Sequence, residues 1–109
     1  MSPGTIAPRL CRLHCTAVLG REVPVASDFR VRLLGLAFLR REEAGAGLLI
    51  PRCASVHTFG MRFALDLFFL DPRNGLVACH LDVPPCRLIS HRGAAAVLEL
   101  PSRVGRTVR

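Results

Sequence analysis

Residues 63–70 form an almost continuous apolar run, so both faces of a strand here would be apolar. Asp66 is the polar exception inside this run. A strand that is apolar on both faces belongs in the interior of a sheet, covered on both sides. The turn sequence Asp-Pro-Arg-Asn-Gly at 71–75 comes next, followed by the apolar segment 76–83. This order predicts a β-hairpin.

The remaining pattern predicts a small domain built mainly of strands. Strands are expected at three other apolar segments: 10–19, 48–50 and 94–100. Residues 27–35 form the one helical pattern, with Ser27 able to cap its start and Gly35 near its end. Short strands, tight turns and one short helix predict a compact, mostly β (α+β) fold, a partly closed antiparallel barrel or sandwich.

The length of 109 residues fits a single domain. We expect a flexible N-terminal arm at 1–9, a β-rich domain at 10–101 and a basic tail at 102–109. No apolar run reaches the ~18 residues of a membrane helix, and the N-terminus does not resemble a secretory signal. The sequence therefore predicts a soluble, cytoplasmic protein without membrane association. We expect a monomer or weak homodimer.

The formal net charge is +7, and arginine supplies all of the Lys+Arg count because lysine is absent. A basic surface can attract nucleic acid. Arginine without lysine is also what very GC-rich codons produce. A loose cluster forms at Arg103, Arg106 and Arg109, but no aromatic residues lie between the arginines for stacking on bases. We therefore expect no nucleic-acid partner.

The cysteines, together with nearby His and Met side chains, are residue types that can bind a metal. The odd number of cysteines and the lack of a Cys-x-x-Cys pair favour small buried apolar residues in a reduced protein: Cys11, Cys15, Cys53, Cys79 and Cys86. Cys53, His57 and Met61 are spaced by four. In a strand the outer two lie about 26 Å apart, whereas ligands of one ion lie within about 4.6 Å of each other. We expect no metal and no cofactor, with Cys53 and His57 as the weak alternative.

Asp66 is the main candidate for a functional side chain. An ionised carboxylate inside an apolar layer requires an ion pair or hydrogen bonds. The partners that the sequence offers are His57, Thr58, Arg62 and the backbone amides of the preceding loop. Two interpretations remain open: His57, Thr58 and Asp66 line a polar pocket, or Asp66 only organises the loop.

The segment GLLIPRCASVHTFGMRFALDLFFLD, followed by a turn, a strand, PPCRL and AAAVLELP, resembles the domain of unknown function 192 family over roughly residues 16–101. The matching positions are Gly35, Leu36, Gly47, Leu48, Pro51, Cys53, His57, Thr58, Gly60, Met61, Asp66, Asp71, Pro85, Leu98 and Glu99. The chain departs from the family pattern at Arg52 and at the Pro-Ser-Arg that follows the last strand. The resemblance implies a compact, mostly β single domain of bacteria and archaea, and it implies no activity.

Two functional hypotheses follow from these residues. The first is a non-catalytic module whose pocket binds a small polar ligand or an extended protein segment. Its candidate ligand-binding residues are His57, Thr58, Met61, Asp66 and Glu99. The alternative is a small hydrolase or transferase that uses His57 or Asp66 as an acid-base group. The binding module is favoured, because no nucleophile motif, phosphate loop or carboxylate pair is present in the sequence.

Overall fold

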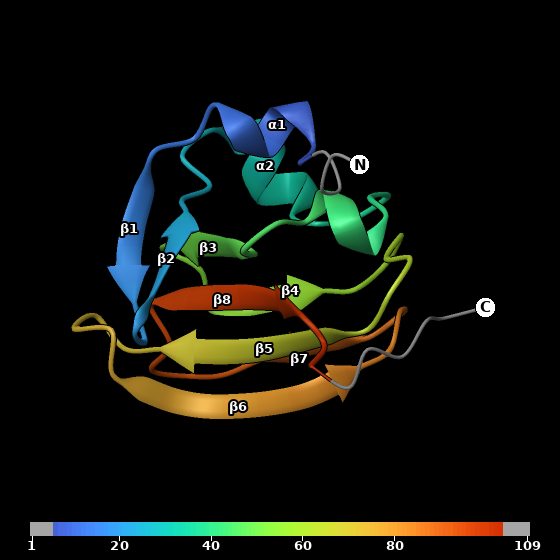
Figure 1. Cartoon of the computed structure of the whole chain (residues 1–109). Coiled ribbons are helices and arrows are strands. Elements are labelled where there is room, and N and C mark those ends of the chain that lie inside the picture. Colours follow the sequence, from blue (N-terminus) through green and yellow to red (C-terminus); the bar gives the residue numbers. More distant parts are fainter. Residues whose placement is uncertain (1–5, 104–109) are drawn as a thin grey trace.

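The structure, a computed structural model, describes residues 6–103, which form strands, two short helices and a 3₁₀ turn (Figure 1). In chain order the elements are α1 (Pro8–Cys11), β1 (Cys15–Val18), β2 (Arg21–Pro24), α2 (Phe29–Leu34), η1 (Arg41–Glu43), β3 (Leu48–Pro51), β4 (Ser55–His57), β5 (Leu65–Leu70), β6 (Leu76–Val83), β7 (Leu88–Ser90) and β8 (Ala96–Pro101). The strands form three antiparallel sheets that, over the described residues, do not close into one barrel. The predicted mostly β fold is confirmed.

The central sheet has four strands in the order β3-β8-β5-β6. β5 lies between β8 and β6, so the prediction of an interior strand at 63–70 is confirmed, as is the hairpin to β6. The turn of this hairpin is held by Asp71, whose carboxylate accepts hydrogen bonds from the amides of Arg73 and Gly75, both at 2.8 Å. A short acidic side chain that binds the amides ahead of it is typical of a tight turn.

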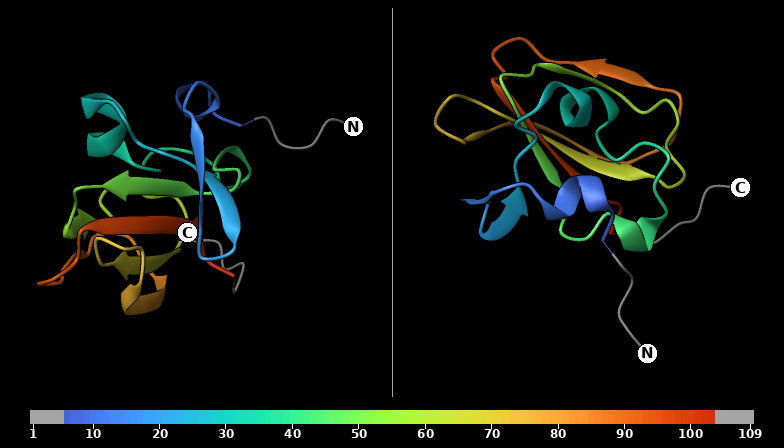
Figure 2. Two further views of the ribbon diagram at one scale, coloured as in Figure 1. Left: turned by 90° about the vertical axis from the view of Figure 1, so that its left-hand side faces the viewer. Right: turned by 90° about the horizontal axis from the view of Figure 1, so that it is seen from above.

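Two apolar layers cover the two faces of the central sheet. Figures 1 and 2 show the backbone of the helices and of the β1-β2 hairpin that contribute to them. On one face the helices and the small β4-β7 sheet contribute to what we call the helix-side core. It includes Leu10, Val31, Leu36, Leu48, Val56, Leu65, Leu67, Phe69 and Val97. On the other face the β1-β2 hairpin forms the hairpin-side core with Val18, Val23, Leu49, Phe68, Leu70, Leu98 and Leu100. Alternate residues of β5 and β8 therefore point into different cores.

The beginning of the chain differs from the sequence-based expectation. The strand predicted at 10–19 is shorter, because residues 10 and 11 belong to α1 and the strand starts at Cys15. Pro8 opens α1, where its fixed φ suits the first helical turn. Ala7 is buried and its amide donates to the carbonyl of Glu43 at 3.0 Å, so this part of the expected arm is packed. Residues 1–5 and 104–109, with Arg106 and Arg109, lie outside the described residues.

The predicted helix is present as α2, but its cap differs by one residue. Asp28, not Ser27, is the N-cap, and its carboxylate accepts from the amide of Val31 at 2.9 Å. Both side chains can cap a helix, so the sequence alone does not fix which of the two lies at the first turn. Gly35 ends the helix with φ 54°, and its amide donates to the carbonyl of Val31 at 2.8 Å.

The interpretation of the cysteines as buried apolar residues is wrong for most of them. Cys53 is half-buried, and the others are exposed: Cys11, Cys15, Cys79 and Cys86. These four lie on the first helix, the hairpin, the edge strand β6 and the loop after it, which border solvent. None of the helices in the described part of the chain is long and apolar enough to cross a membrane.

Candidate functional site

The most unusual buried side chain of the domain is Glu99, in the middle of β8. Its neighbours across the sheet are Leu48 in β3 and Leu67 in β5, both members of the helix-side core. The glutamate is only 3% exposed. A carboxylate in such an apolar layer is strongly destabilised in its ionised form unless donors surround it.

The donors that surround Glu99 satisfy it only in part. The backbone N–H of Leu36, just after α2, donates to the carboxylate. The Oε1 atom is buried and has no hydrogen-bond partner in the described structure. Burial raises the pKa of Glu99 to about 7, although the Leu36 hydrogen bond and the charge of Arg9 act in the opposite direction. Glu99 therefore exchanges its proton close to neutral pH.

Gly35 allows the end of α2 to lie close to this carboxylate. A Cβ at Gly35 would lie 2.8 Å from Glu99 Oε1, and the φ of 54° also favours glycine. Arg9 fixes the same turn, because its Nη2 donates to the carbonyls of Gly35 at 2.8 Å and Ala37 at 2.6 Å. Within the described residues the buried Nε of Arg9 has no partner, and the Nη2 bonds hold the guanidinium at this turn.

A small pocket of about 50 Å³ opens beside Glu99, between the end of α2 and strands β3 and β4. Its polar lining residues are Arg32, Cys53, Ser55, His57 and Glu99. The guanidinium of Arg32 is tied to the β3-β4 loop through the carbonyls of Pro51 and Arg52. The pocket therefore combines a largely buried acceptor with a cation and an imidazole at its wall.

His57 and Cys53 reach this pocket from β4 and the loop before it. The Nδ1 of His57 accepts from the amide of Phe59 at 3.2 Å, and the two rings stack with centroids 5.4 Å apart. A neutral imidazole whose Nδ1 accepts carries its proton on Nε2. The thiol of Cys53 donates to the carbonyl of Ser55 at 3.0 Å. Among residues 6–103 no group of three His, Cys, Asp or Glu side chains converges on a possible metal position.

Thr58 and Met61, two of the predicted site residues, lie elsewhere. Thr58 is buried, and its hydroxyl donates to the carbonyl of Pro84 and accepts from the amide of Arg87, each at 2.8 Å. These bonds fasten the β6-β7 loop to the segment after β4. Met61 packs in the helix-side core. Neither side chain lines the pocket at Glu99.

Asp66 lies on the opposite face of the sheet from Glu99. Its neighbour across the sheet is Leu100, a member of the hairpin-side core. Oδ1 accepts from the amide of Asp82 at 2.8 Å, and Oδ2 accepts from the amide of Arg103 at 3.1 Å. The expected partners, His57, Thr58, Arg62 or the preceding loop, are replaced by amides of β6 and of the segment after β8. Sequence periodicity does not reveal such long-range donors.

The structure thus brings together His57 and Glu99 of the predicted set, with Cys53 of the weak metal alternative, and separates Thr58, Met61 and Asp66 from them. Sequence reasoning missed Arg9, Arg32 and the contact of Gly35 with the carboxylate. The charge inside the apolar segment 94–100 was the signal for Glu99. No comparable signal marked Arg9, because it precedes the segments with recognisable periodicity.

The fold is a small mostly β domain with one partly satisfied glutamate beneath a short helix. A family model matches residues 14–108, and the chain belongs to this family, DUF192, described as an uncharacterized ACR. No curated protein matches the chain.

Two solved structures are similar in fold. A protein of unknown function from Novosphingobium aromaticivorans DSM 12444 is 22% identical, with a TM-score of 0.60, over 84% of this chain and 73% of that one. A putative transcription regulator from Sinorhizobium meliloti 1021 is 23% identical, with a TM-score of 0.64, over 83% of this chain and 78% of that one. Identities this low establish the fold alone.

Proposed function

We propose that the domain is a non-catalytic binding module, and that the pocket at Glu99 accepts the hydrogen-bond-donating tip of a small polar ligand or of an extended protein segment. The observation that carries this proposal is the buried Oε1 of Glu99, which has no partner within the described chain. An unsatisfied buried acceptor costs about 1–3 kcal/mol. A donor that enters the pocket would recover that free energy only in the bound state.

The size of the pocket limits what can enter. A volume of about 50 Å³ is comparable with one or two water molecules, each with a share of about 30 Å³ in the liquid. An amine, amide or hydroxyl group fits this space, and the rest of the ligand stays outside, beside His57 and Arg32. The exposed side chain of Leu33, which borders the same pocket, offers an apolar contact to that outer part.

The engagement of the other candidate side chains supports binding over catalysis. Asp66 and Thr58, the other polar candidates, have their side-chain oxygens occupied by backbone partners. The Cys53 thiol is committed to the carbonyl of Ser55. A nucleophile or a paired carboxylate beside Glu99 would have favoured a reaction.

One observation favours a second candidate, the small hydrolase or transferase. The pKa of Glu99, raised by burial to about 7, is suited to a general acid-base that works at neutral pH. In this reading Glu99 takes the acid-base role that the sequence assigned to Asp66. Hydrolysis of p-nitrophenyl acetate tests it: a rate that falls at least about tenfold in Glu99→Gln, with the fold retained, would favour the enzyme.

Fragment binding followed by NMR tests the binding module directly. Methylamine, formamide and methanol are small enough for the pocket, and their titration into ¹⁵N-labelled protein reports on each amide. We expect saturable shifts at Gly35, Leu36 and His57 that disappear in Glu99→Leu. Glu42→Gln, which removes an exposed acid that does not line the pocket, is the matched control. Shifts that are absent at these amides, or that persist unchanged in Glu99→Leu, would refute the proposal.

A further inference from the structure

A second hollow, separate from the Glu99 pocket, carries arginines from three different parts of the chain. Its volume is about 420 Å³, and it shares no lining residue with that pocket. Arg21 comes from β2, Arg41 from η1, and Arg103 from the segment just after β8. Leu100 and Pro101 of β8 supply an apolar part of the wall.

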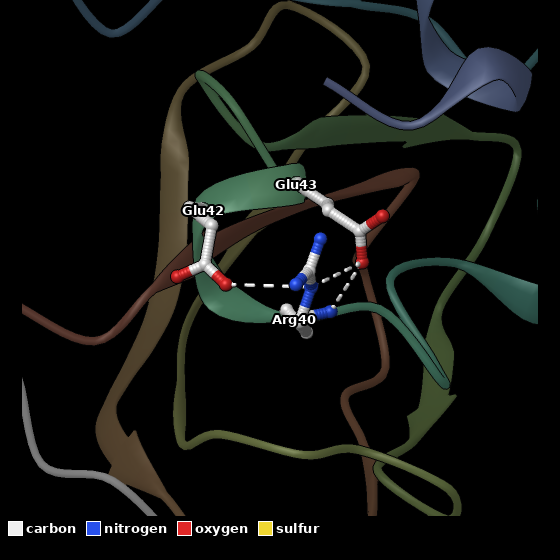
Figure 3. A network of polar contacts seen from close by, with 3 residues as sticks. All are labelled: Arg40, Glu42 and Glu43. Carbon is white, nitrogen blue, oxygen red and sulfur yellow. Dashed lines mark hydrogen bonds and ion pairs between the residues drawn. The ribbon is translucent and has the colours of Figure 1, made fainter. Parts of the chain in front are cut away.

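Glu42, which lines this hollow, and Glu43, next to it in sequence, are engaged with a different arginine. Figure 3 shows the carboxylates of Glu42 and Glu43 on either side of Arg40, and each lies 3.5 Å from its Nε. Glu42 is the one acid among the described lining residues, and it shares the single charge of Arg40 with Glu43. Three arginines and one acid line the described wall of the hollow, so its charge balance is positive.

Two of the three arginines are anchored, Arg41 through its side chain and Arg103 through its backbone. The Nη2 of Arg41 donates to the carbonyl of Ser102, while its Nη1 is buried and has no partner in the described structure. The backbone of Arg103 is fixed because its amide donates to Oδ2 of Asp66. The buried aspartate thus determines where the Arg103 side chain leaves the fold. A guanidinium that is already held, as that of Arg41 is, loses less conformational entropy when it binds a ligand.

We propose that this hollow binds the phosphate group of a small phosphorylated molecule. Guanidinium groups match phosphate oxygens in charge and in the geometry of paired hydrogen bonds. The volume is within the range of small-molecule sites and exceeds a phosphate alone, so the remainder of the ligand can lie against Leu100 and Pro101. Nucleic acid offers the same phosphate chemistry, but no aromatic ring lines the described wall for base stacking.

The test is calorimetric titration of the full chain with pyrophosphate and with ribose 5-phosphate at low ionic strength. The double variant Arg41→Gln/Arg103→Gln should lose at least about tenfold in affinity, because two charge-assisted contacts are removed. Arg12→Gln/Arg30→Gln is the matched control, since it lowers the net charge equally at another hollow, which also contains Asp28. We expect this control to change the affinity less than about twofold, by general charge alone.

A second double variant separates a loss of binding from a loss of the fold. Arg21→Gln/Arg103→Gln leaves the bond from Arg41 to Ser102 intact and should show a comparable loss of affinity. Equal losses in the site and control variants, or no saturable binding of either compound, would overturn the proposal. A short single-stranded oligonucleotide that binds more tightly than ribose 5-phosphate through the same arginines would also overturn it, in favour of nucleic acid.

Discussion

Asp66 and Glu99 are two buried carboxylates on neighbouring strands, and they differ in what surrounds them. Asp66 is 1% exposed and Glu99 is 3% exposed, so burial does not distinguish them. Both oxygens of Asp66 accept backbone hydrogen bonds, whereas Oε1 of Glu99 accepts none in the described structure. The comparison teaches that a buried acid indicates a binding site only when one of its oxygens lacks a hydrogen-bond donor.

The local backbone explains the difference. The register of β5 with β6 shifts between Leu65 and Leu67, and Asp82, at this irregularity, has φ 55°. The irregular pairing leaves the Asp82 amide available to Asp66. Glu99 lies in a strand that pairs regularly on both sides, so the sheet offers it no such amide. The backbone donor to Glu99 is Leu36, at the end of α2.

The largest effect is expected at Asp66. Asp66→Ala leaves the amides of Asp82 and Arg103 buried without this acceptor, so we expect a loss of about 4 kcal/mol in the free energy of unfolding. Urea denaturation measures it. Asp28→Ala, which removes a single capping bond at the surface, is the control and should lose about 1 kcal/mol. If the two variants were equally stable, Asp66 would not hold these strands.

Glu99 should make stability depend on pH in the opposite sense from an ion-paired acid. Its folded pKa of about 7 exceeds the ordinary value of 4.5, so the folded state retains the proton longer than the unfolded chain. Its contribution is fully present below pH 4.5 and is lost as pH rises to about 7, an amount of about 3 kcal/mol.

The difference in stability between the wild type and Glu99→Gln separates the contribution of Glu99 from that of the histidines. Stability measured by denaturation from pH 4 to pH 8 should fall less in the variant, which should be the more stable of the two above pH 7. Parallel curves for the two proteins would show that ionisation of Glu99 does not destabilise the folded state.

A smaller effect is expected at Gly35. Gly35→Ala introduces a Cβ 2.8 Å from Glu99 Oε1 and places alanine at φ 54°, which should destabilise the protein by about 2 kcal/mol. The contact with the carboxylate is separated from backbone strain by a double-mutant cycle with Glu99→Ala. The substitution should cost less in that background, and an unchanged cost would assign the whole effect to the backbone.

The smallest change is expected from Arg9→Gln. The charge of Arg9 lowers the pKa of Glu99, so its removal should move the pH-dependent loss of stability to higher pH. Arg12→Gln is a control of equal charge, and it should leave the midpoint in place. If the midpoint shifts equally in both variants, the shift comes from the net charge of the protein and not from Arg9 itself.

The sequence predicted the elements whose pattern is long or whose turn is distinctive. The hairpin of β5 and β6 follows from the continuous apolar run at 63–70 and the turn at 71–75, and β6 has the predicted bounds. The strands β2, β4 and β7 have three or four residues each, too few to show a period of two. Helix α1, with four residues, is equally short.

The site was harder to predict than the fold. Asp66 and Glu99 both appear in the sequence as a charge inside an apolar strand, and that signal measures burial only. Whether an acid is satisfied depends on Asp82, Arg103 and Leu36, which lie far from it in sequence and meet it only after the sheet has formed. Local patterns do not encode these contacts.

The most direct test of the contrast is the titration of the side-chain carboxyl carbon of Glu99, followed by ¹³C NMR in the intact protein. A buried, partly satisfied Glu99 should give a midpoint at about pH 7. A midpoint near the ordinary value of 4.5 would mean that water or unrecognised donors solvate the carboxylate, and the proposed pocket would lose its basis.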